Sequence, residues 1–217
     1  MASEGIPFVA AAGFVLIALG FAASMTGSGF LWGLTYTEAL VLLFIVFFFR
    51  DPDRIIPKGD NLVLSVGDGK VVVIEEVNFP ELSEEKLVQV SVFLSAFNVH
   101  VNRVPVSGTV DVVKYFPGKF LAAWNEKASL DNEQTLISVD TGTKRVYFKQ
   151  IAGLIARRIV YDLKPGQTVD AGDRFGLIRF GSRVDILLPK DTKIIVKLGD
   201  AVRGGETVIG VLANEAY

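Results

Sequence analysis

Two long apolar segments open the chain, and a short polar turn separates them. Residues 5–24 (GIPFVAAAGFVLIALGFAAS) and 30–49 (FLWGLTYTEALVLLFIVFFF) contain Glu38 as their only charged residue. A helix of about 20 residues is roughly 30 Å long, which matches the hydrocarbon thickness of a bilayer. The pattern therefore predicts a transmembrane helical hairpin over residues 1–50, with its turn at 25–29.

A signal peptide fits the first apolar segment poorly, because no basic residue precedes it and a second apolar run follows at once. A buried helical hairpin of a soluble protein remains the alternative. Arg50, Arg54 and Lys58 follow the second segment, and positive residues beside a span stay in the cytoplasm. We therefore expect a protein of the cell membrane, with its N-terminus and everything after Arg50 on the cytoplasmic side.

The rest of the sequence alternates short β-branched runs with Gly, Pro and Asp. Residues 51–61 (DPDRIIPKGDN) have the composition of a linker, and runs such as KVVVIEEV, LVQVSVFLS and TKIIVKL follow it. Many short strands at close spacing predict a mainly β domain over 62–217, a compact sandwich or barrel-like fold. Within it, 163–178 and 196–211 share a spacing of Gly, Val and acidic residues that resembles lipoyl-type hairpins. A cofactor-carrier role is not favoured, because no lysine stands at the tip of a tight turn.

Composition excludes several kinds of chemistry. The 217 residues include no Cys and a single His, His100. A disulfide framework, a thiolate nucleophile and metal sites built from Cys or several His are therefore excluded, and we expect no metal. The net charge is −2 and the calculated isoelectric point is about 5.5, so no global basic surface for nucleic acid is expected.

A Gly-Ser pair interrupts an apolar, strand-like run in RFGSRVDILLP (179–189). Glycine is unexpected inside a strand, although most Gly-Ser pairs are loops. Because Gly181 has no side chain and tolerates strained backbone, the Ser182 hydroxyl can attack the preceding carbonyl and form an ester by an N→O acyl shift. Elimination and hydrolysis would then convert Ser182 into a pyruvoyl group.

His100 and Asp68 are the candidate proton-transfer residues. In FNVHVNRVPV, strand alternation places His100 on one face with Asn98 and Asn102. Histidine has an unperturbed pKa of about 6.5, which suits proton transfer near neutrality, although a lone His is more often structural. Asp68, in SVGDGKV, fits an Asp-Gly turn, and the alternative is an acid that orients and charges His100.

Several motifs together resemble one family. In its short bacterial and archaeal form, the phosphatidylserine decarboxylase family is similar to this chain over residues 50–212, through SVGDGKV, AFNVHVNRVPVSG, Asn132–Glu133, QIAGLIARRIV and FGSRVD. The resemblance implies a self-processing enzyme that is cut between Gly181 and Ser182. The products would be a β chain (1–181) and an α chain (182–217), forming a heterodimer whose higher oligomeric state stays open.

The resemblance also implies a mechanism. His100, oriented by Asp68, would deprotonate Ser182, and the pyruvoyl group at residue 182 would be the only cofactor. It would form a Schiff base with the serine amine of phosphatidylserine and release CO₂ and phosphatidylethanolamine. Arg103 and Lys119 are candidates for binding the lipid phosphate.

Two positions depart from the larger members of the family, and three alternatives stay open. The larger forms have Gly-Ser-Thr where this chain has Gly181-Ser182-Arg183, and a second His where it has Arg103. The alternatives are an archaetidylserine decarboxylase, a pyruvoyl decarboxylase of a soluble amino acid, and a non-enzymatic, membrane-anchored β adaptor. The apolar N-terminus argues against the soluble substrate, and the adaptor predicts an uncut chain.

Overall fold

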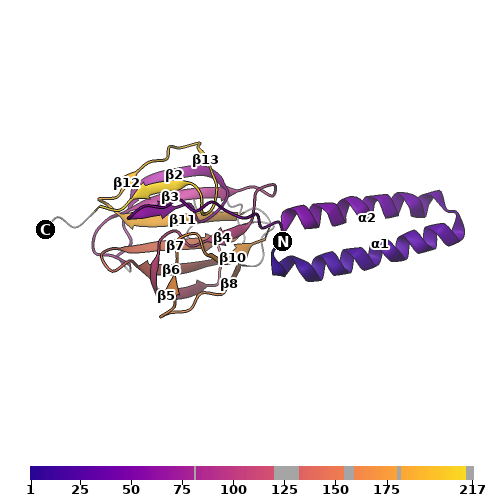
Figure 1. Cartoon of the computed structure of the whole chain (residues 1–217), viewed down its shortest axis with the longest axis horizontal. Coiled ribbons are helices and arrows are strands. Elements are labelled where there is room, and N and C mark those ends of the chain that lie inside the picture. The colour runs from indigo at the N-terminus through magenta and orange to yellow at the C-terminus, as the bar shows by residue number, and fades with distance from the viewer. Residues whose placement is uncertain (81, 120–131, 154–158, 180–181, 214–217) are drawn as a thin grey trace. The chain divides into compact units, whose positions relative to one another are not determined.

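The chain folds into a helical unit, residues 1–52, and a β unit, residues 53–217. The computed structural model in Figure 1 describes all residues except 81, 120–131, 154–158, 180–181 and 214–217. The architecture is mainly β, preceded by two apolar helices, and this confirms the predicted fold class.

The helical unit is a hairpin of two long helices, α1 (Ile6–Thr26) and α2 (Gly29–Phe48), after a 3-10 turn, η1 (Ser3–Gly5). Gly27 ends α1 in the left-handed region, at φ 66°, and the Ser28 hydroxyl accepts a hydrogen bond from an amide in the first turn of α2. Both helices are long and apolar enough to cross a membrane, and only 11% and 6% of their most apolar stretches are buried. Apolar surface exposed to this extent indicates membrane association and not the core of a soluble protein.

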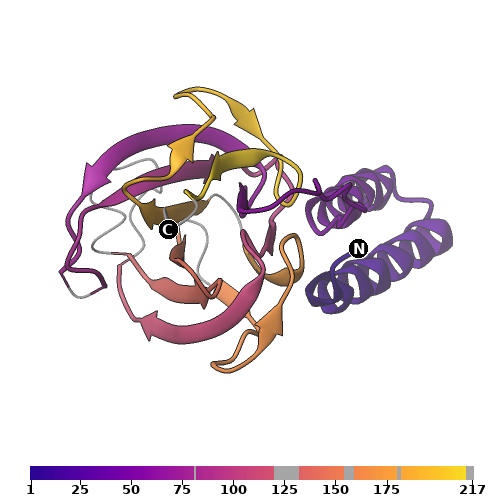
Figure 2. The ribbon, with the colours of Figure 1, turned by 60° about the vertical axis from the view of Figure 1, so that its left-hand side comes forward.

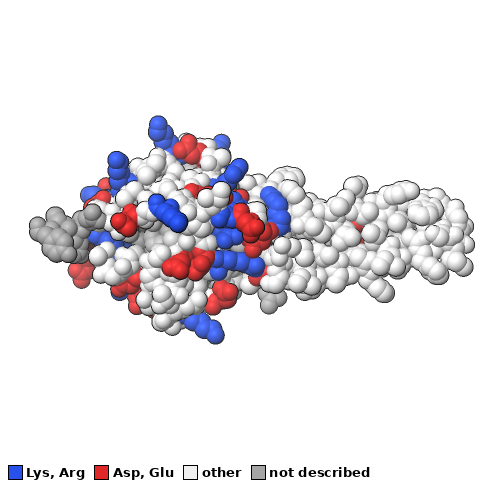
Figure 3. Space-filling model, in the orientation of Figure 1, with Lys and Arg blue, Asp and Glu red and all other residues white. Residues whose placement is uncertain are grey.

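The charged residues lie elsewhere. In Figure 3 the Lys, Arg, Asp and Glu side chains gather on the β unit, and the helical hairpin presents an almost uncharged surface. Glu38 is the only charged residue between Gly5 and Phe49. The chain thus divides into an apolar unit and a polar unit.

In the β unit, the described strands form one large antiparallel sheet and two small ones. The large sheet has the order β13 (Ala201–Val202), β2 (Gly69–Val77), β3 (Leu87–Leu94), β11 (Ser182–Pro189), β7 (Arg145–Ile151), β6 (Gln134–Asp140), β5 (Gly108–Phe116), β9 (Thr168–Val169). It curls into a half-barrel, as Figure 2 shows. The small sheets are β1 (Leu62–Leu64), β14 (Val208–Val211), β12 (Lys193–Ile194) and β4 (Val101–Arg103), β10 (Arg174–Ile178), β8 (Ile159–Tyr161).

The β unit consists of two halves with the same strand arrangement. In the large sheet, the strand order β13-β2-β3-β11 of one half corresponds to the strand order β9-β5-β6-β7 of the other. The small sheet β1-β14-β12 likewise corresponds to the small sheet β4-β10-β8. The similar segments 163–178 and 196–211 occupy equivalent places in the two halves. The second half, β4 to β10, is inserted into the first between β3 and β11, so the chain passes from one half to the other twice.

The main core lies between the large sheet and the small sheets. Its fully buried members come from both halves and include Val92, Phe148, Phe175, Val184 and Ile209. The ring of Phe148 on β7 packs edge-on against that of Phe175 on β10, with centroids 5.2 Å apart. A second, smaller apolar cluster covers the opposite face of the large sheet, so both faces of β11 are buried.

Candidate active site

The strands that flank the two connections between the halves pair with each other, and the predicted catalytic residues lie at their ends. In the large sheet, Leu94 at the end of β3 pairs with Ser182 at the start of β11. In the small sheet, Val101 of β4 pairs with Leu177 of β10. His100 directly precedes β4, and Ser182 directly follows the return from β10. The topology therefore brings the two segments together from distant parts of the sequence.

Ser182 is fully buried and has no hydrogen-bond partner for its Oγ among the described residues. Strand alternation and the β11–β3 register place its side chain with Leu94 and Val184 on the core face of the sheet. A buried hydroxyl without a hydrogen bond costs about 1–3 kcal/mol, so it requires an explanation. Gly181, the other half of the predicted cleavage site, lies outside the described residues.

His100 is 2% exposed, and a backbone carbonyl orients its ring. Nδ1 lies 3.0 Å from the carbonyl oxygen of Asn98. A carbonyl only accepts, so this contact assigns the proton of the neutral ring to Nδ1 and leaves the lone pair on Nε2. The His100 carbonyl in turn accepts a hydrogen bond from the amide of Ile178, at 3.4 Å. The ring is thus prepared to act as a base through Nε2.

Asp68 is held by an arginine and a backbone amide. Both of its carboxylate oxygens accept hydrogen bonds from Arg54 Nη2, at 2.9 and 3.0 Å, and the amide of Gly204 donates to Oδ1 at 2.8 Å. The side chains of Asp68 and Arg54 are 13% and 6% exposed. Among the described residues, His100 is not a hydrogen-bond partner of Asp68. The expected action of Asp68 on His100 therefore stays a prediction.

Glu206 extends the same ionic cluster. Its Oε2 lies 3.5 Å from Arg54 Nη1, and its Oε1 accepts a hydrogen bond from the amide of Ile55, at 3.2 Å. The Ile55 hydrogen bond, followed by the charges of Arg54 and Arg203, holds the pKa of the Glu206 carboxyl below its ordinary value, although partial burial opposes the shift. The segment that follows the helical unit is thereby tied to residues on both sides of the predicted cleavage site.

A chain of buried polar side chains connects β4 to the large sheet. The Thr135 hydroxyl on β6 donates to Gln150 Oε1 on β7 at 2.9 Å, and Gln150 Nε2 donates to Asn102 Oδ1 on β4 at 2.8 Å. All three side chains are fully buried. Asn102 lies two residues after His100, so this network fixes the strand that carries the candidate base.

A second buried polar group lies on the opposite face of β11. Arg183 Nε donates to Asp185 Oδ1 at 2.6 Å, and Arg183 Nη2 donates to Ser91 Oγ on β3 at 2.8 Å. The side chains of Arg183 and Asp185 are 3% and 1% exposed. This ion pair anchors the residue that follows Ser182 to the centre of the sheet.

The candidate phosphate ligands occupy different places. Arg103, at the end of β4, donates from Nη1 to the carbonyl of Gly172 at 3.1 Å. Lys119 is exposed beyond the end of β5, and it forms an isolated bridge with Asn132. Arg103 therefore lies on the strand that follows His100, whereas Lys119 bridges Asn132 next to the end of the large sheet where Gln134 pairs with Ile151 and Ile151 with Arg183.

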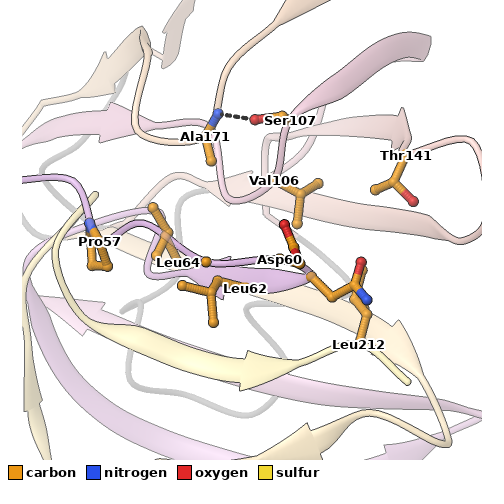
Figure 4. Close-up of a pocket in the computed structure, with 11 residues that line it drawn as sticks. Pro57, Asp60, Leu62, Leu64, Val106, Ser107, Thr141, Ala171 and Leu212 are labelled. Carbon is orange, nitrogen blue, oxygen red and sulfur yellow. Dashed lines mark hydrogen bonds between the residues drawn. The ribbon is translucent and has the colours of Figure 1, made fainter. Parts of the chain in front are cut away.

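The pocket drawn in Figure 4 does not contain the candidate residues. It has a volume of about 420 Å³ and is lined by residues from the linker, β1 and neighbouring loops, including Asp60, Leu64, Ser107 and Ala171. Its wall is tied by a hydrogen bond from the Ala171 amide to Ser107 Oγ, at 2.9 Å. Within the described part of the chain, no cluster of three or more His, Asp or Glu side chains is arranged to hold a metal ion.

Sequence reasoning missed three features of this region: the amide of Asn102, the Arg54–Asp68 pair and the Arg183–Asp185 pair. The HVNR pattern places Asn102 on the face of His100, which was the available signal for it. In the sequence, Arg54 stood out as a positive residue that follows the second apolar segment. Its carboxylate partner comes from the next strand region, and no local pattern reveals such a pairing.

Comparison with known proteins identifies relatives along nearly the whole chain. A family model described as phosphatidylserine decarboxylase matches residues 41–210. Three curated relatives share the name phosphatidylserine decarboxylase proenzyme. The protein from Geotalea uraniireducens is 46% identical over 98% of this chain and 96% of its own length. Those from the Wolbachia of Brugia malayi and from Desulfotalea psychrophila are 45% and 44% identical, over 97% of this chain and 94% and 95% of their lengths.

Proposed function

The chain belongs to the phosphatidylserine decarboxylase family, and on this premise we propose that it converts phosphatidylserine into phosphatidylethanolamine and CO₂ through a pyruvoyl group made from Ser182. The observation that carries the proposal is the fully buried Ser182 Oγ, which has no hydrogen-bond partner among the described residues. The proenzyme names of the relatives agree with a precursor that is processed. They do not favour the adaptor alternative, which predicts an uncut chain.

The self-processing reaction starts at the Ser182 hydroxyl. Oγ attacks the carbonyl carbon of residue 181, the peptide C–N bond breaks, and an ester joins residue 181 to Ser182 Oγ. Loss of the Ser182 Cα proton and rupture of the Cβ–Oγ bond release residue 181 as a carboxylate and leave dehydroalanine. One water then hydrolyses the imine tautomer of dehydroalanine, releasing ammonia and leaving the pyruvoyl group at the start of the α chain.

His100 is the proposed base for the Ser182 hydroxyl. The Asn98 carbonyl holds the proton on Nδ1, so Nε2 presents its lone pair. His100 is the only imidazole in the chain, and general base catalysis by a positioned side chain contributes about 10²–10⁴-fold. No second imidazole can replace it.

Asp68 is the proposed acid that favours the protonated form of His100. Its hydrogen bonds go to Arg54 and Gly204 in this structure, so its action on His100 is through charge. The adjoining strand geometry supports the assignment, because Val66 accepts a hydrogen bond from the amide of Arg103 at 2.8 Å. The loop of Asp68 is thereby held against the strand that follows His100.

In the decarboxylation, the pyruvoyl carbonyl supplies an electron sink for the substrate amine and for the electron pair left by CO₂. The buried position of residue 182 excludes bulk water from that carbonyl. We propose Arg103 as the first ligand of the lipid phosphate, because it follows His100 on β4, and Lys119 as the second candidate. The apolar helical hairpin keeps the enzyme where the acyl chains of its substrate remain.

The intact mass of the purified full chain tests the proposed processing. We expect two pieces, of 181 and 36 residues, the smaller one blocked to Edman degradation because a pyruvoyl group has no free amine. Ser182→Ala lacks Oγ and should remain one inactive chain, whereas Ser91→Ala, which removes a different buried hydroxyl on the same sheet, should still be cut. An active enzyme with an uncut chain and an intact serine at 182 would remove the pyruvoyl mechanism.

Sidedness and substrate need separate measurements. Protease added to right-side-out spheroplasts should leave the β unit intact if the residues after Arg50 lie in the cytoplasm, and permeabilised cells are the control. Digestion from outside would reverse the orientation. Assays with phosphatidylserine and archaetidylserine in matched detergent micelles compare the two lipid backbones, and preference for the archaeal lipid would replace the proposed substrate.

A further inference from the structure

In the described part of the chain, Ser182 Oγ on β11 and Asn102 Nδ2 on β4 are buried polar atoms without a hydrogen-bond partner. Both side chains are fully buried. Partnerless buried donors are rare in folded proteins, and two in one region indicate a group that is absent from the resting arrangement.

The position of Asn102 follows from its neighbours on both sides of β11. Its Oδ1 accepts from Gln150 on β7 at 2.8 Å. Its Nδ2 lies 3.2 Å from the point where a Cβ on Gly67 would stand, and that point is 3.1 Å from the side chain of Leu94 on β3. β3 and β7 flank β11, and both Leu94 and Gln150 face the same side as Ser182. The Asn102 amide therefore lies over the beginning of β11.

The direction of the Asn102 amide is fixed by the polar network. Gln150 Nε2 donates to the backbone carbonyl of Val160 at 3.5 Å, and a carbonyl only accepts. Nε2 is therefore the donor toward β4, and Oε1 accepts from the Thr135 hydroxyl. Asn102 must therefore present Oδ1 to Gln150 and Nδ2 away from it. A donor held in this way needs no reorganisation when a negative charge forms beside it.

We propose that Asn102 Nδ2 donates a hydrogen bond to the oxyanion that forms when Ser182 Oγ attacks the preceding carbonyl. This inference rests on the proposed self-processing. In that step Oγ bonds to the carbonyl carbon, the hydroxyl proton passes to His100, and the carbonyl π pair becomes the charge on the oxygen. The carbonyl is covalently attached to the Ser182 nitrogen, so its oxygen develops charge beside the serine side chain. Collapse of the oxyanion then breaks the C–N bond and gives the ester, while His100 returns the proton to the Ser182 nitrogen, which leaves as a free amine.

The test is the rate of self-cleavage of the full chain, followed by intact mass after synthesis in a cell-free system with detergent. Asn102→Asp keeps the size of the side chain and the acceptor for Gln150 but loses the donor. We expect it to be cut about 10²–10³-fold more slowly than the wild type, the usual effect of removing one oxyanion donor. Asn102→Leu, which loses both polar atoms, should be equally slow.

Tyr147→Phe is the matched control, because it removes the hydrogen bond from the Tyr147 hydroxyl to the Leu82 carbonyl on the opposite face of the large sheet and leaves the Thr135–Gln150–Asn102 network intact. A purely structural role for Asn102 predicts that Tyr147→Phe and Asn102→Asp slow the cut alike, and this result would overturn the proposal. Thermal unfolding of each variant by circular dichroism measures folding. If Asn102→Asp has a much lower melting temperature than the wild type, the self-cleavage rate of Asn102→Leu is the test instead. Cleavage of Asn102→Leu at the wild-type rate would also overturn the proposal.

Hydroxylamine identifies the step that is affected. It cleaves the ester intermediate and leaves an α chain with an N-terminal serine, which differs in mass from the pyruvoyl form. If Asn102 acts on the oxyanion, hydroxylamine should not restore fast cleavage to Asn102→Asp. Rapid hydroxylamine cleavage of this variant would move its defect to the elimination and exclude the proposed role. A wild type that is never cut would instead reject the proposed function itself.

Discussion

Replacing Arg183 tests how strongly the residue next to Ser182 is anchored. Its guanidinium lies 2.6 Å from Asp185 and 2.8 Å from Ser91, with 3% of the side chain exposed. Removing one partner of a buried ion pair costs about 3–5 kcal/mol, because the remaining charge keeps its desolvation penalty. For a domain of this size, about 1 kcal/mol lowers the melting temperature by roughly 2–4 °C. We therefore expect Arg183→Met to lower it by roughly 6–20 °C.

The assay is thermal unfolding of the full chain in mild detergent, followed by circular dichroism. Each substitution should be made in a chain that also carries Ser182→Ala. This chain is not cleaved, so the variants cannot differ in the extent of self-cleavage. Arg145→Met is the matched control, because Arg145 lies 3.2 Å from Asp111 with the two side chains 47% and 39% exposed. An exposed pair contributes about 0–1 kcal/mol, so this variant should melt within roughly 4 °C of its parent.

Salt separates the two pairs further. Screening at 1 M salt weakens interactions between exposed charges and leaves buried ones nearly unchanged. The effect of Arg183→Met should therefore persist at high salt. Equal losses for Arg183→Met and Arg145→Met would refute the reasoning, since burial would then not decide the contribution of the pair.

Two other predictions concern the base and the ionic cluster. His100→Ala should slow self-cleavage, measured by intact mass, by at least about 10²-fold, because no other imidazole can take the Ser182 proton. Asp68→Asn should also slow self-cleavage, because it removes the negative charge that favours the imidazolium form of His100. Glu206→Gln should lower the melting temperature at neutral pH, and this difference should vanish in acid. The folded-state pKa of Glu206 is lowered, so its carboxylate stabilises the fold above its unfolded pKa, and the contribution disappears as pH falls through the folded pKa.

Each of these two predictions has a contrary result. Cleavage of His100→Ala at the wild-type rate would reassign His100 to structure or to the decarboxylation step. A Glu206→Gln variant whose melting temperature differs from the wild type equally at pH 3 and pH 7 would show that its carboxylate charge contributes nothing. Glu76→Gln is the control for the second test, because the Glu76 carboxylate contacts only the exposed Lys86 and Lys190 among the residues that the structure describes, at 3.7 and 3.6 Å.

The sequence alone determined the features that depend on local pattern. Uncharged runs long enough for a bilayer predicted the hairpin, and alternation of β-branched residues with Gly and Pro predicted the β unit. Ser182 stood out because a Gly-Ser pair interrupts a strand-like run, and His100 because it is the single His of the chain, whereas the role of Asp68 followed from the family resemblance. These inferences needed only composition, period and the order of motifs.

Tertiary structure decided what depends on pairings between distant segments. The insertion of β4 to β10 between β3 and β11 brings the start of β4 and the start of β11 into one region, and no local pattern contains that information. The same holds for the bond from Arg54 to Asp68 and for the Thr135–Gln150–Asn102 network, whose partners come from separate strands. These contacts matter because they are buried. A polar atom removed from water costs free energy unless it forms a hydrogen bond in the folded protein, and an atom without one can still bond to a group that forms only during the reaction.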